Sequence, residues 1–348
     1  MSVTEKVFGK DPVSGQEVKE YTLENRAGMK VGILNYGAII SKLLVPDSKG
    51  ATADVVTGFD TLDGYAKNPA FFGAVIGPNA NRIGKACFTI DGVEYHIPVN
   101  DGINNLHSDM EEGYHKRIFD VATTQDQVIL SLTDRDGAMG FPGNKCLTVT
   151  YTLTERNELK IRYEGESDKN TLLNFTNHTY FNLRGHKDPT ILDHELTLFA
   201  SNFTPTIEGS IPTGEFASVE GTPMDFRKGR VIGKDIDADT QQLKIGGGYD
   251  HNWVIDGADG QMKLCAVLTA PGTDRKMKVY TTLPGIQFYA GNFIGQQSGK
   301  DGASYHNRCA LALETQIYPD SVHHDAFPDA VFGPDRRYLS ETIYAFEN

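Results

Sequence analysis

Cysteine is scarce in this sequence, with four residues in a chain of 348. No two cysteines stand as a CxxC pair, and none has the local spacing that a zinc site or a small disulfide framework requires. The pair His323-His324 offers no shared metal site either, because adjacent side chains on a strand point to opposite faces. The sequence therefore predicts free thiols and no bound metal. The cysteines are Cys87, Cys146, Cys265 and Cys309.

Long apolar runs are absent as well. Nowhere do about 18 consecutive apolar residues occur, which is the length that a membrane-spanning helix needs. Residues 1–20 contain no apolar run that could serve as the core of a secretory signal peptide. We therefore expect a cytoplasmic protein with no membrane partner.

Positive charge is under-represented. Lysine and arginine number 33 against 46 aspartates and glutamates, which leaves a formal net charge of −13. This field repels a polyphosphate backbone, so no nucleic-acid partner is expected. The remaining composition, 39% hydrophobic and 23% charged, is typical of a soluble globular chain with a sizeable core.

Alternation with a period of two is the dominant pattern that is present. Residues 147–154 alternate apolar side chains with threonines, which predicts a strand with one buried face. Residues 159–163 repeat the pattern and make a hairpin with it. A second hairpin is expected where residues 87–90 and 93–97 flank Asp91-Gly92, because Asp-Gly tolerates the positive φ angles of a type I′ turn.

The same kind of run recurs along the chain, whereas helical periodicity is almost absent. With 36 glycines and 15 prolines between the runs, this spacing predicts an all-β fold, one large antiparallel β-sandwich. Nothing marks a domain boundary, so we expect a single domain over residues 1–348. The further runs are residues 29–34, 39–45, 127–132, 196–200, 264–269 and 277–282.

Residues 172–183 place a histidine and several side-chain amides in an otherwise apolar, aromatic strand. On a strand, His178 and Tyr180 share one face, and Asn177 and Thr179 share the other. A buried histidine is by default a core residue with one backbone partner. The surrounding amides make His178 a candidate for a binding or catalytic role.

Glu314 stands within residues 309–319, a run that is apolar on both faces. Burying an unpaired carboxylate costs several kcal/mol, so this glutamate either has partners or occupies a site where a raised proton affinity is useful. A structural Glu–Arg pair is the alternative to a functional role.

Three other segments contribute polar groups. Residues 246–253 bring Asp250 and Trp253 directly after three glycines, and the tryptophan stacks on a sugar ring or belongs to the core. Residues 77–84 supply Asn81 and Arg82, and residues 104–107 supply His107. Together these donors, acceptors and aromatic rings are typical of a site for a neutral polyhydroxylated ligand. No cofactor motif accompanies them, so proton transfer is expected rather than redox chemistry.

These residues belong to segments that resemble the aldose 1-epimerase (galactose mutarotase) family nearly end to end. The resemblance implies a large β-sandwich, the galactose mutarotase-like supersandwich, and an enzyme that interconverts the α and β anomers of aldohexoses such as D-galactose and D-glucose. The matching segments are residues 35–38, 45–47, 54–60, 80–83, 105–107, 141–143, 176–183, 212–215, 249–252, 284–293, 313–316 and 319–321.

Carried over to this sequence, the resemblance makes His178 the general acid and Glu314 the general base. A base removes the proton of the anomeric hydroxyl while an acid protonates the ring oxygen, and reclosure after rotation about C1–C2 reverses both transfers. No cofactor or metal is implied, and the partner is a small-molecule aldose bound by a monomer or homodimer. The substrate-binding residues would be Asn81, Arg82, His107, Tyr180, Asp250 and Gln287.

The sequence departs from the usual family pattern at Pro78, at Ser108-Asp109 and at His323-His324. These positions flank matched binding residues, so we expect them to bear on sugar preference through single contacts worth roughly 1 kcal/mol or more.

Three alternatives stay open. The same sandwich could be a non-catalytic sugar-binding module, because fold does not fix function. A glycosidase would need two facing carboxylates, and Asp250 with Glu314 is the pair available. An epimerase of sugar phosphates would need a cluster of arginine or lysine, which we do not find.

Overall fold

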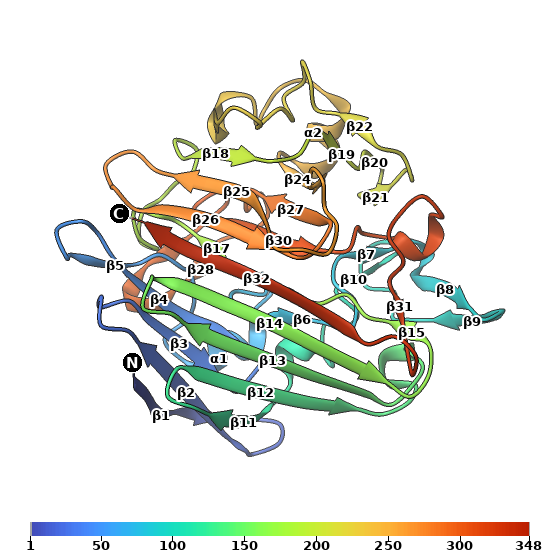
Figure 1. The fold of residues 1–348 in the computed structure, drawn as a ribbon, viewed down its shortest axis with the longest axis horizontal. Coiled ribbons are helices and arrows are strands. Elements are labelled where there is room, and N and C mark those ends of the chain that lie inside the picture. Colours follow the sequence, from blue (N-terminus) through green and yellow to red (C-terminus); the bar gives the residue numbers. More distant parts are fainter. Residues whose placement is uncertain (1, 348) are drawn as a thin grey trace.

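A nine-stranded antiparallel sheet crosses the molecule in the computed structural model, which describes residues 2–347. Strand β32 occupies its centre, between β14 and β26, and Figure 1 shows this strand in red between green and orange neighbours. The order is β11 (Asp120–Thr123), β12 (Gln127–Asp134), β13 (Lys145–Leu153), β14 (Glu158–Ser167), β32 (Tyr338–Glu347), β26 (Lys276–Thr281), β25 (Lys263–Thr269), β18 (Glu195–Leu198) and β23 (Arg230–Val231).

Two further antiparallel sheets complete the main layers. The first comprises β1 (Ser2–Lys10), β2 (Glu17–Glu24), β3 (Lys30–Leu34), β4 (Ile40–Pro46) and β5 (Thr52–Asp54). The second has the order β17 (Tyr180–Phe181), β30 (Leu311–Gln316), β27 (Gly285–Tyr289), β24 (Asp250–Val254), β19 (Asn202–Phe203) and β22 (Ala217–Ser218). The predicted all-β antiparallel architecture is therefore confirmed.

Six two-stranded ribbons and short helices connect these sheets. The ribbons are β7 (Arg82–Ile83) with β10 (Asn105–Leu106), β6 (Val75–Ile76) with β16 (Thr176–Asn177), β8 (Cys87–Ile90) with β9 (Val93–His96), β15 (Thr171–Leu172) with β31 (Val331–Phe332), β20 (Thr206–Ile207) with β21 (Ile211–Pro212), and β28 (Gln297–Ser298) with β29 (Ser304–Tyr305). The helices are α1 (Leu62–Lys67) and α2 (Gln241–Gly246), with 3₁₀ turns η1 (Gly84–Ala86), η2 (Tyr114–Lys116), η3 (Ala138–Gly140), η4 (Ile232–Lys234), η5 (Lys300–Gly302) and η6 (Ser321–His323). No helix among residues 2–347 has the length and apolarity needed to cross a bilayer.

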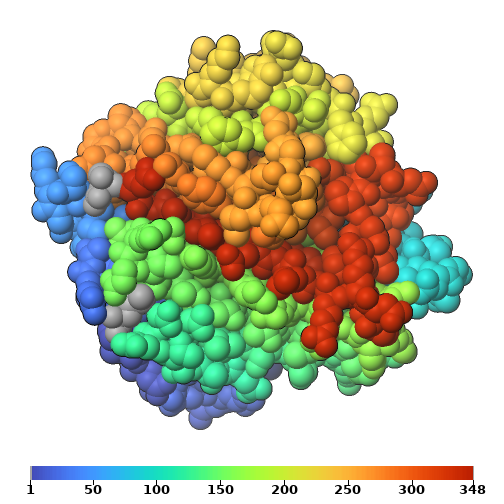
Figure 2. Space-filling view, viewed as in Figure 1, coloured from blue at the N-terminus to red at the C-terminus, as the bar shows by residue number. Residues whose placement is uncertain are grey.

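Strand β13 shows why the alternation predicts the sheet. Its apolar residues are buried and its threonines are half-buried along the whole strand. Tyr151, on the buried face, donates a hydrogen bond of 2.7 Å to the carbonyl oxygen of Ala38, which ties this sheet to the N-terminal segment. One apolar core runs from Tyr21 to Phe346 through all three large sheets. In the space-filling view, residues from the C-terminal strand separate green from orange segments (Figure 2).

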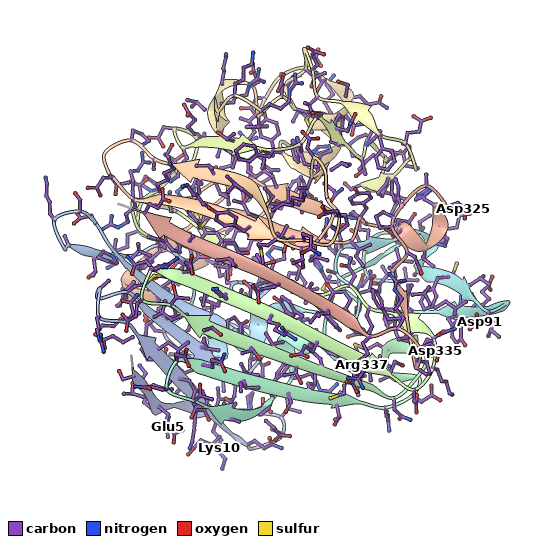
Figure 3. The ribbon with its side chains drawn as sticks, in the orientation of Figure 1. Glu5, Lys10, Asp91, Asp325, Asp335 and Arg337 are labelled. Atoms are coloured by element: carbon purple, nitrogen blue, oxygen red, sulfur yellow. The ribbon has the colours of Figure 1, made fainter. Side chains whose placement is uncertain are left out.

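The hairpin at Asp91-Gly92 forms as predicted. These two residues have φ angles of 54° and 76°, as a type I′ turn requires, and they join β8 to β9. Asp91 lies at the tip of the hairpin, at the edge of the molecule (Figure 3), and its carboxylate accepts a hydrogen bond of 2.8 Å from Asn170. All four cysteines are free thiols, also as predicted.

Residues 172–183 do not form the single strand that the sequence suggested. The segment divides into β15, β16 and β17, and His178 and Thr179 lie outside all three strands. Asn177 explains the break, because its side-chain oxygen accepts the backbone N–H of Thr179 at 3.1 Å in place of a strand partner. The segment thereby crosses from β6 to β30, and the break places His178 between them.

Candidate active site

A cavity of about 190 Å³ opens where β7, β10, β17, β24, β27 and β30 meet. This is smaller than the roughly 300–1,000 Å³ of pockets for drug-sized ligands, so the cavity suits one small molecule. Seven of the eight predicted site residues line it, and Gln287 does not. The lining residues are Pro69, Ala70, Phe71, Asn81, Arg82, Leu106, His107, His178, Tyr180, Asp250, Tyr289, Phe293 and Glu314.

Strand register brings three of these residues onto one face of the six-stranded sheet. Gln287 pairs with Glu314 across β27 and β30, and Asp250 pairs with Tyr289 across β24 and β27. Because side chains alternate along a strand, Asp250 and Glu314 point to the cavity face. Trp253 lies on the opposite face of β24 and is fully buried. Its indole N–H donates to the carbonyl of Met224 at 3.1 Å, so this tryptophan is a core residue and not a stacking platform for a sugar.

His178 and Glu314 lie next to each other in the wall of the cavity. Nε2 of His178 lies 3.6 Å from Oε1 of Glu314, and both side chains are almost fully buried. Burial raises the pKa of Glu314 well above its ordinary value, Asp250 raises it further, and Arg82 opposes the shift. Burial also lowers the pKa of His178 to about 3. Burial therefore disfavours the charged form of both groups.

The alternative of a structural Glu–Arg pair does not hold. Within residues 2–347, Glu314 has no lysine or arginine nitrogen within 4.0 Å, whereas Nε2 of His178 lies 3.6 Å from its Oε1. Its Oε2 atom is buried and has no hydrogen-bond partner in this part of the chain. A buried carboxyl oxygen without a partner is costly unless a ligand hydroxyl can supply the missing hydrogen bond.

His107 presents a fixed donor to the cavity. The backbone N–H of Asn81 donates to Nδ1 of His107 at 3.1 Å, so Nδ1 is unprotonated and the proton of the neutral ring is on Nε2. Burial holds the pKa of His107 well below its usual range, and His178, Arg82 and His115 lower it further. Nε2–H of His107 is therefore available to donate to an oxygen of a ligand.

The hydrogen bond from Asn81 to Nδ1 of His107 also argues against a metal ion in the cavity. One ligand atom each from His107, His178 and Glu314 lies within 4.8 Å of the others, a spacing compatible with metal coordination. A metal-binding histidine normally donates from its second ring nitrogen, yet Nδ1 of His107 accepts a hydrogen bond from Asn81. The donor set therefore does not fit a metal.

Asn81 and His107 both adopt left-handed backbone conformations, with φ angles of 62° and 56°. Asparagine tolerates this region better than most residues, whereas for histidine it is uncommon. Such strain costs on the order of 1–3 kcal/mol and concentrates at functional sites. Asn81 is also fixed by its own side-chain oxygen, which accepts the N–H of Arg82 at 2.8 Å.

Arg82 lies between two carboxylates. Its Nε donates to Oδ2 of Asp101 at 2.7 Å, and its Nη1 lies 4.0 Å from Oδ2 of Asp250. The sequence-based prediction did not include Asp101, because nothing in the local pattern shows that this turn residue reaches the ribbon β7–β10.

A chain of side-chain amides is hydrogen-bonded to Asp250. Gln287 Nε2 donates to Oδ1 of Asp250 at 2.7 Å, and Gln316 Nε2 donates to Oε1 of Gln287 at 3.1 Å. Gln316 also donates to Oδ1 of Asn252 at 3.2 Å. The structure therefore places Gln287 behind Asp250, where it fixes the carboxylate. Gln316 was not predicted, although the alternation of β30 puts it on the same face as Glu314.

Aromatic rings close the remaining walls. The ring of Phe71 lies 4.9 Å from His107, 5.7 Å from His178 and 4.8 Å from His115, measured between centroids. Tyr180 packs 5.0 Å from His178. Phe293 lines the cavity with 69% of its surface exposed. Phe71 and Phe293 were not among the predicted site residues, because nothing in the local sequence separates an aromatic side chain of a site from one of the core.

The departures from the family pattern do not line the cavity. Pro78, Ser108, Asp109, His323 and His324 are not among the residues that line the cavity. The hydroxyl of Ser108 donates to the carbonyl of Asn79 at 2.9 Å and accepts its N–H at the same distance, which braces the segment before Asn81. His323 bonds through Nδ1 to Asp320 at 2.6 Å, and this bond raises the pKa of the histidine.

Known proteins resemble this chain over its whole length. The profile of the aldose 1-epimerase family matches residues 19–345. A galactose mutarotase of Bos taurus is 40% identical over 347 residues, covering 99% of each chain. An aldose 1-epimerase of Escherichia coli (strain K12) is 37% identical over 335 residues, covering 95% of this chain and 96% of the relative.

Solved structures agree with these sequence relatives. An aldose epimerase homologue from C. elegans superimposes with a TM-score of 0.86 at 31% identity, covering 94% of this chain and 98% of that one. A galactose 1-epimerase from Lactobacillus acidophilus gives a TM-score of 0.86 at 28% identity, covering 100% of this chain and 99% of the other. On the profile match and on relatives of this identity and coverage, the chain belongs to the aldose 1-epimerase family.

Proposed function

We propose that this enzyme interconverts the α and β anomers of an aldohexose such as D-galactose or D-glucose, with Glu314 and His178 transferring the protons. The observation that carries this proposal is the buried pair itself, one carboxyl and one imidazole 3.6 Å apart on the wall of a small polar cavity. Ring opening of a hemiacetal needs one group that accepts a proton and one that donates a proton, and each must reverse its role on closure.

The proton count of the pair fits this cycle. Without sugar, burial favours the uncharged imidazole of His178 and the protonated carboxyl of Glu314, a state in which the pair holds one proton. In the sugar complex, the proposed roles require this proton on His178 and a carboxylate at Glu314. Glu314 then takes the proton of the anomeric hydroxyl as His178 gives its proton to the ring oxygen. The open-chain aldehyde is thereby formed beside an uncharged pair, which is the arrangement that burial favours.

The remaining lining residues support binding and charge stabilisation. Nε2–H of His107 and the guanidinium of Arg82 are donors, and the carboxylate of Asp250 is an acceptor, for hydroxyls of the sugar. Phe71, Tyr289 and Phe293 provide ring surfaces against which the C–H groups of a pyranose pack. A phosphorylated sugar is disfavoured, because Arg82 is the single lysine or arginine among the lining residues and it already contacts Asp101.

Location, assembly and domain structure complete the proposal. We infer a cytoplasmic enzyme of galactose and hexose metabolism that works as a monomer or homodimer. One continuous apolar core supports a single domain over residues 1–348. No cofactor is required, since both proton transfers are made by side chains of the chain itself.

Polarimetry on freshly dissolved α-D-galactose and α-D-glucose tests the reaction. The native protein should speed the approach to anomeric equilibrium above the spontaneous rate, and Glu314→Gln should reduce kcat/KM by on the order of 10²–10⁴-fold. Thr315→Val is the matched control, because Thr315 is buried on the same strand and contacts Thr342 at 2.5 Å instead of the cavity.

Three other outcomes would contradict the proposal. If Glu314→Gln keeps full activity, Glu314 is not the base. If sugars bind without acceleration, the protein is a sugar-binding module. If the protein releases a monosaccharide from a disaccharide, Asp250 and Glu314 act as a glycosidase pair.

A further inference from the structure

The guanidinium of Arg82 makes its shorter carboxylate contact with Asp101, a residue that does not line the cavity. Its Nε–H bonds to Oδ2 of Asp101 at 2.7 Å, whereas its Nη1 is 4.0 Å from Oδ2 of Asp250. Asp101 does not line the cavity, and 35% of its side chain is exposed against 15% for Arg82. Asp101 therefore contacts Arg82 without being part of the cavity lining.

The turn that carries Asp101 is fastened to the strands of the site. The side chain of Asn100 makes two hydrogen bonds to the backbone of Leu106 in β10. Its Nδ2 donates to the carbonyl at 2.9 Å, and its Oδ1 accepts the N–H at 2.7 Å. Asn104 closes the turn by donating its N–H to the carbonyl of Asp101 at 2.9 Å. The side chain of Asn104 accepts the N–H of Lys85, just after β7, also at 2.9 Å.

These hydrogen bonds fix the position of the turn relative to Arg82. Leu106 pairs with Arg82 across the ribbon β7–β10, so the turn of residues 100–104 and the backbone of Arg82 form one hydrogen-bonded unit. The carboxylate of Asp101 is thereby held at a defined position relative to the guanidinium. A carboxylate on an unfastened loop would not supply that precision, because side-chain and loop entropy would oppose the contact.

We propose that Asp101 is a positioning residue that keeps Arg82 extended along the cavity wall and apart from Asp250. An arginine without this partner would pair bidentately with Asp250, the other carboxylate within 4.0 Å of it, because two parallel N–H···O bonds are the preferred geometry. Such a pair would neutralise Asp250 and remove Nη1 and Nη2 from the sugar. This inference rests on the proposed function of the cavity.

The effect should appear in the chemical step and in binding together. A cation displaced by even about 1 Å from its productive position can cost on the order of 10²-fold in rate. We therefore expect Asp101→Ala to lower kcat/KM by about 10- to 100-fold. Asp101→Asn should retain most of the activity, since the amide oxygen still accepts from Nε of Arg82.

A double-mutant cycle separates positioning from a general structural role. If Asp101 acts through Arg82, then Asp101→Ala should have no further effect on kcat/KM once Arg82 has been replaced by Met. A purely structural residue would lower activity equally in both backgrounds. Thermal unfolding of all four proteins checks that each is folded. The rate of mutarotation by the native protein is the reference for the cycle.

Asp188→Ala is the matched control. Asp188 accepts from Nε of Arg184 at 2.9 Å, with 26% of its side chain exposed against 18% for Arg184, and neither residue lines the cavity. This variant should keep native activity. The inference is overturned if Asp101→Ala matches the native enzyme, if its loss is as large in the Arg82→Met background, or if Asp188→Ala loses as much activity. A native protein that does not accelerate mutarotation would instead overturn the proposed function.

Discussion

Nε2 of His178 and Oε1 of Glu314 lie 3.6 Å apart, and burial acts on the two groups in opposite directions. It lowers the pKa of the imidazole to about 3 and raises the pKa of the carboxyl well above its ordinary value. Both shifts favour the state in which the imidazole is neutral, the carboxyl is protonated and the pair holds one exchangeable proton.

The first prediction concerns the pH dependence of activity. The one-proton form is lost on the acid side only when His178 also protonates, near its pKa of about 3, and on the alkaline side when Glu314 deprotonates. We therefore expect kcat/KM not to fall as the pH is lowered from about 6.5 to 5, after subtraction of buffer catalysis. An apparent pKa near 6.5, the ordinary value for histidine, in the acid limb would contradict this assignment.

The second prediction concerns the amide chain behind Asp250. Gln316→Leu leaves Oε1 of Gln287 and Oδ1 of Asn252 without their donor, which should cost about 1–3 kcal/mol of stability for each buried group. With Gln287 free to rotate, Asp250 loses its fixed orientation, and KM for the sugar should rise roughly tenfold. Urea unfolding and initial-rate polarimetry measure the two effects. A variant destabilised to this extent but with native KM would show that the chain is only structural.

The third prediction concerns Phe293 at the mouth of the cavity. This ring is 69% exposed, so Phe293→Ala should leave thermal stability unchanged while removing apolar surface from the sugar site. We expect KM to rise about three- to tenfold with little change in kcat, since the contact is the same in ground and transition states. Phe216→Ala is the control, because Phe216 is 44% exposed but does not line the cavity. Equal effects of the two substitutions would remove Phe293 from the site.

The fourth prediction concerns stability in mild acid. Burial lowers the pKa of four histidines to between about 3 and about 4, so between about pH 6.5 and pH 4 the unfolded chain binds protons that the native protein does not. The free energy of unfolding should therefore fall as the pH drops through this range. The raised pKa values of Glu314 and His323 act in the opposite sense, but they are two groups against four. The histidines are His115, His178, His194 and His251.

Denaturant unfolding at a series of pH values measures this loss, which amounts to about 1.4 kcal/mol per pKa unit for each group. His194→Gln should reduce the pH dependence, because Nε2 of His194 accepts from Leu183 at 3.2 Å and an amide oxygen can replace it. Stability that is constant down to about pH 4.5 would contradict the prediction.

Some of these features can be read from the sequence because their causes are local. The turn at Asp91-Gly92 follows from the backbone tolerance of two neighbouring residues, and the strand β13 follows from its own alternation. The alternation of residues 250–253 also separates Asp250 from Trp253, although it does not show which face meets the core. Resemblance supplied the pairing of His178 with Glu314, which no local pattern contains.

The remaining features depend on contacts between distant segments. The break at His178 arises because Asn177 bonds to Thr179 and the chain changes sheets, which outweighs the strand preference of the apolar residues on either side. The contact between Arg82 and Asp101 requires the ribbon β7–β10 and the fastened turn, and Gln316 gains its role from the register of β30 with β27. Strand propensity carries no information on such partners.

The central position of β32 has a consequence for biosynthesis. Its neighbours β14 and β26 lie over a hundred positions apart in the chain, and both need residues 338–347 to complete their hydrogen bonds. During translation, the edges of β14 and β26 that pair with β32 therefore stay unpaired until residues 338–347 have left the ribosome. Exposed edges of this kind can pair with other strands, so rapid closure by residues 338–347 limits aggregation of the nascent chain. Strand β30, which carries Glu314, is synthesised shortly before β32, so this wall of the cavity and the centre of the nine-stranded sheet are completed at nearly the same stage.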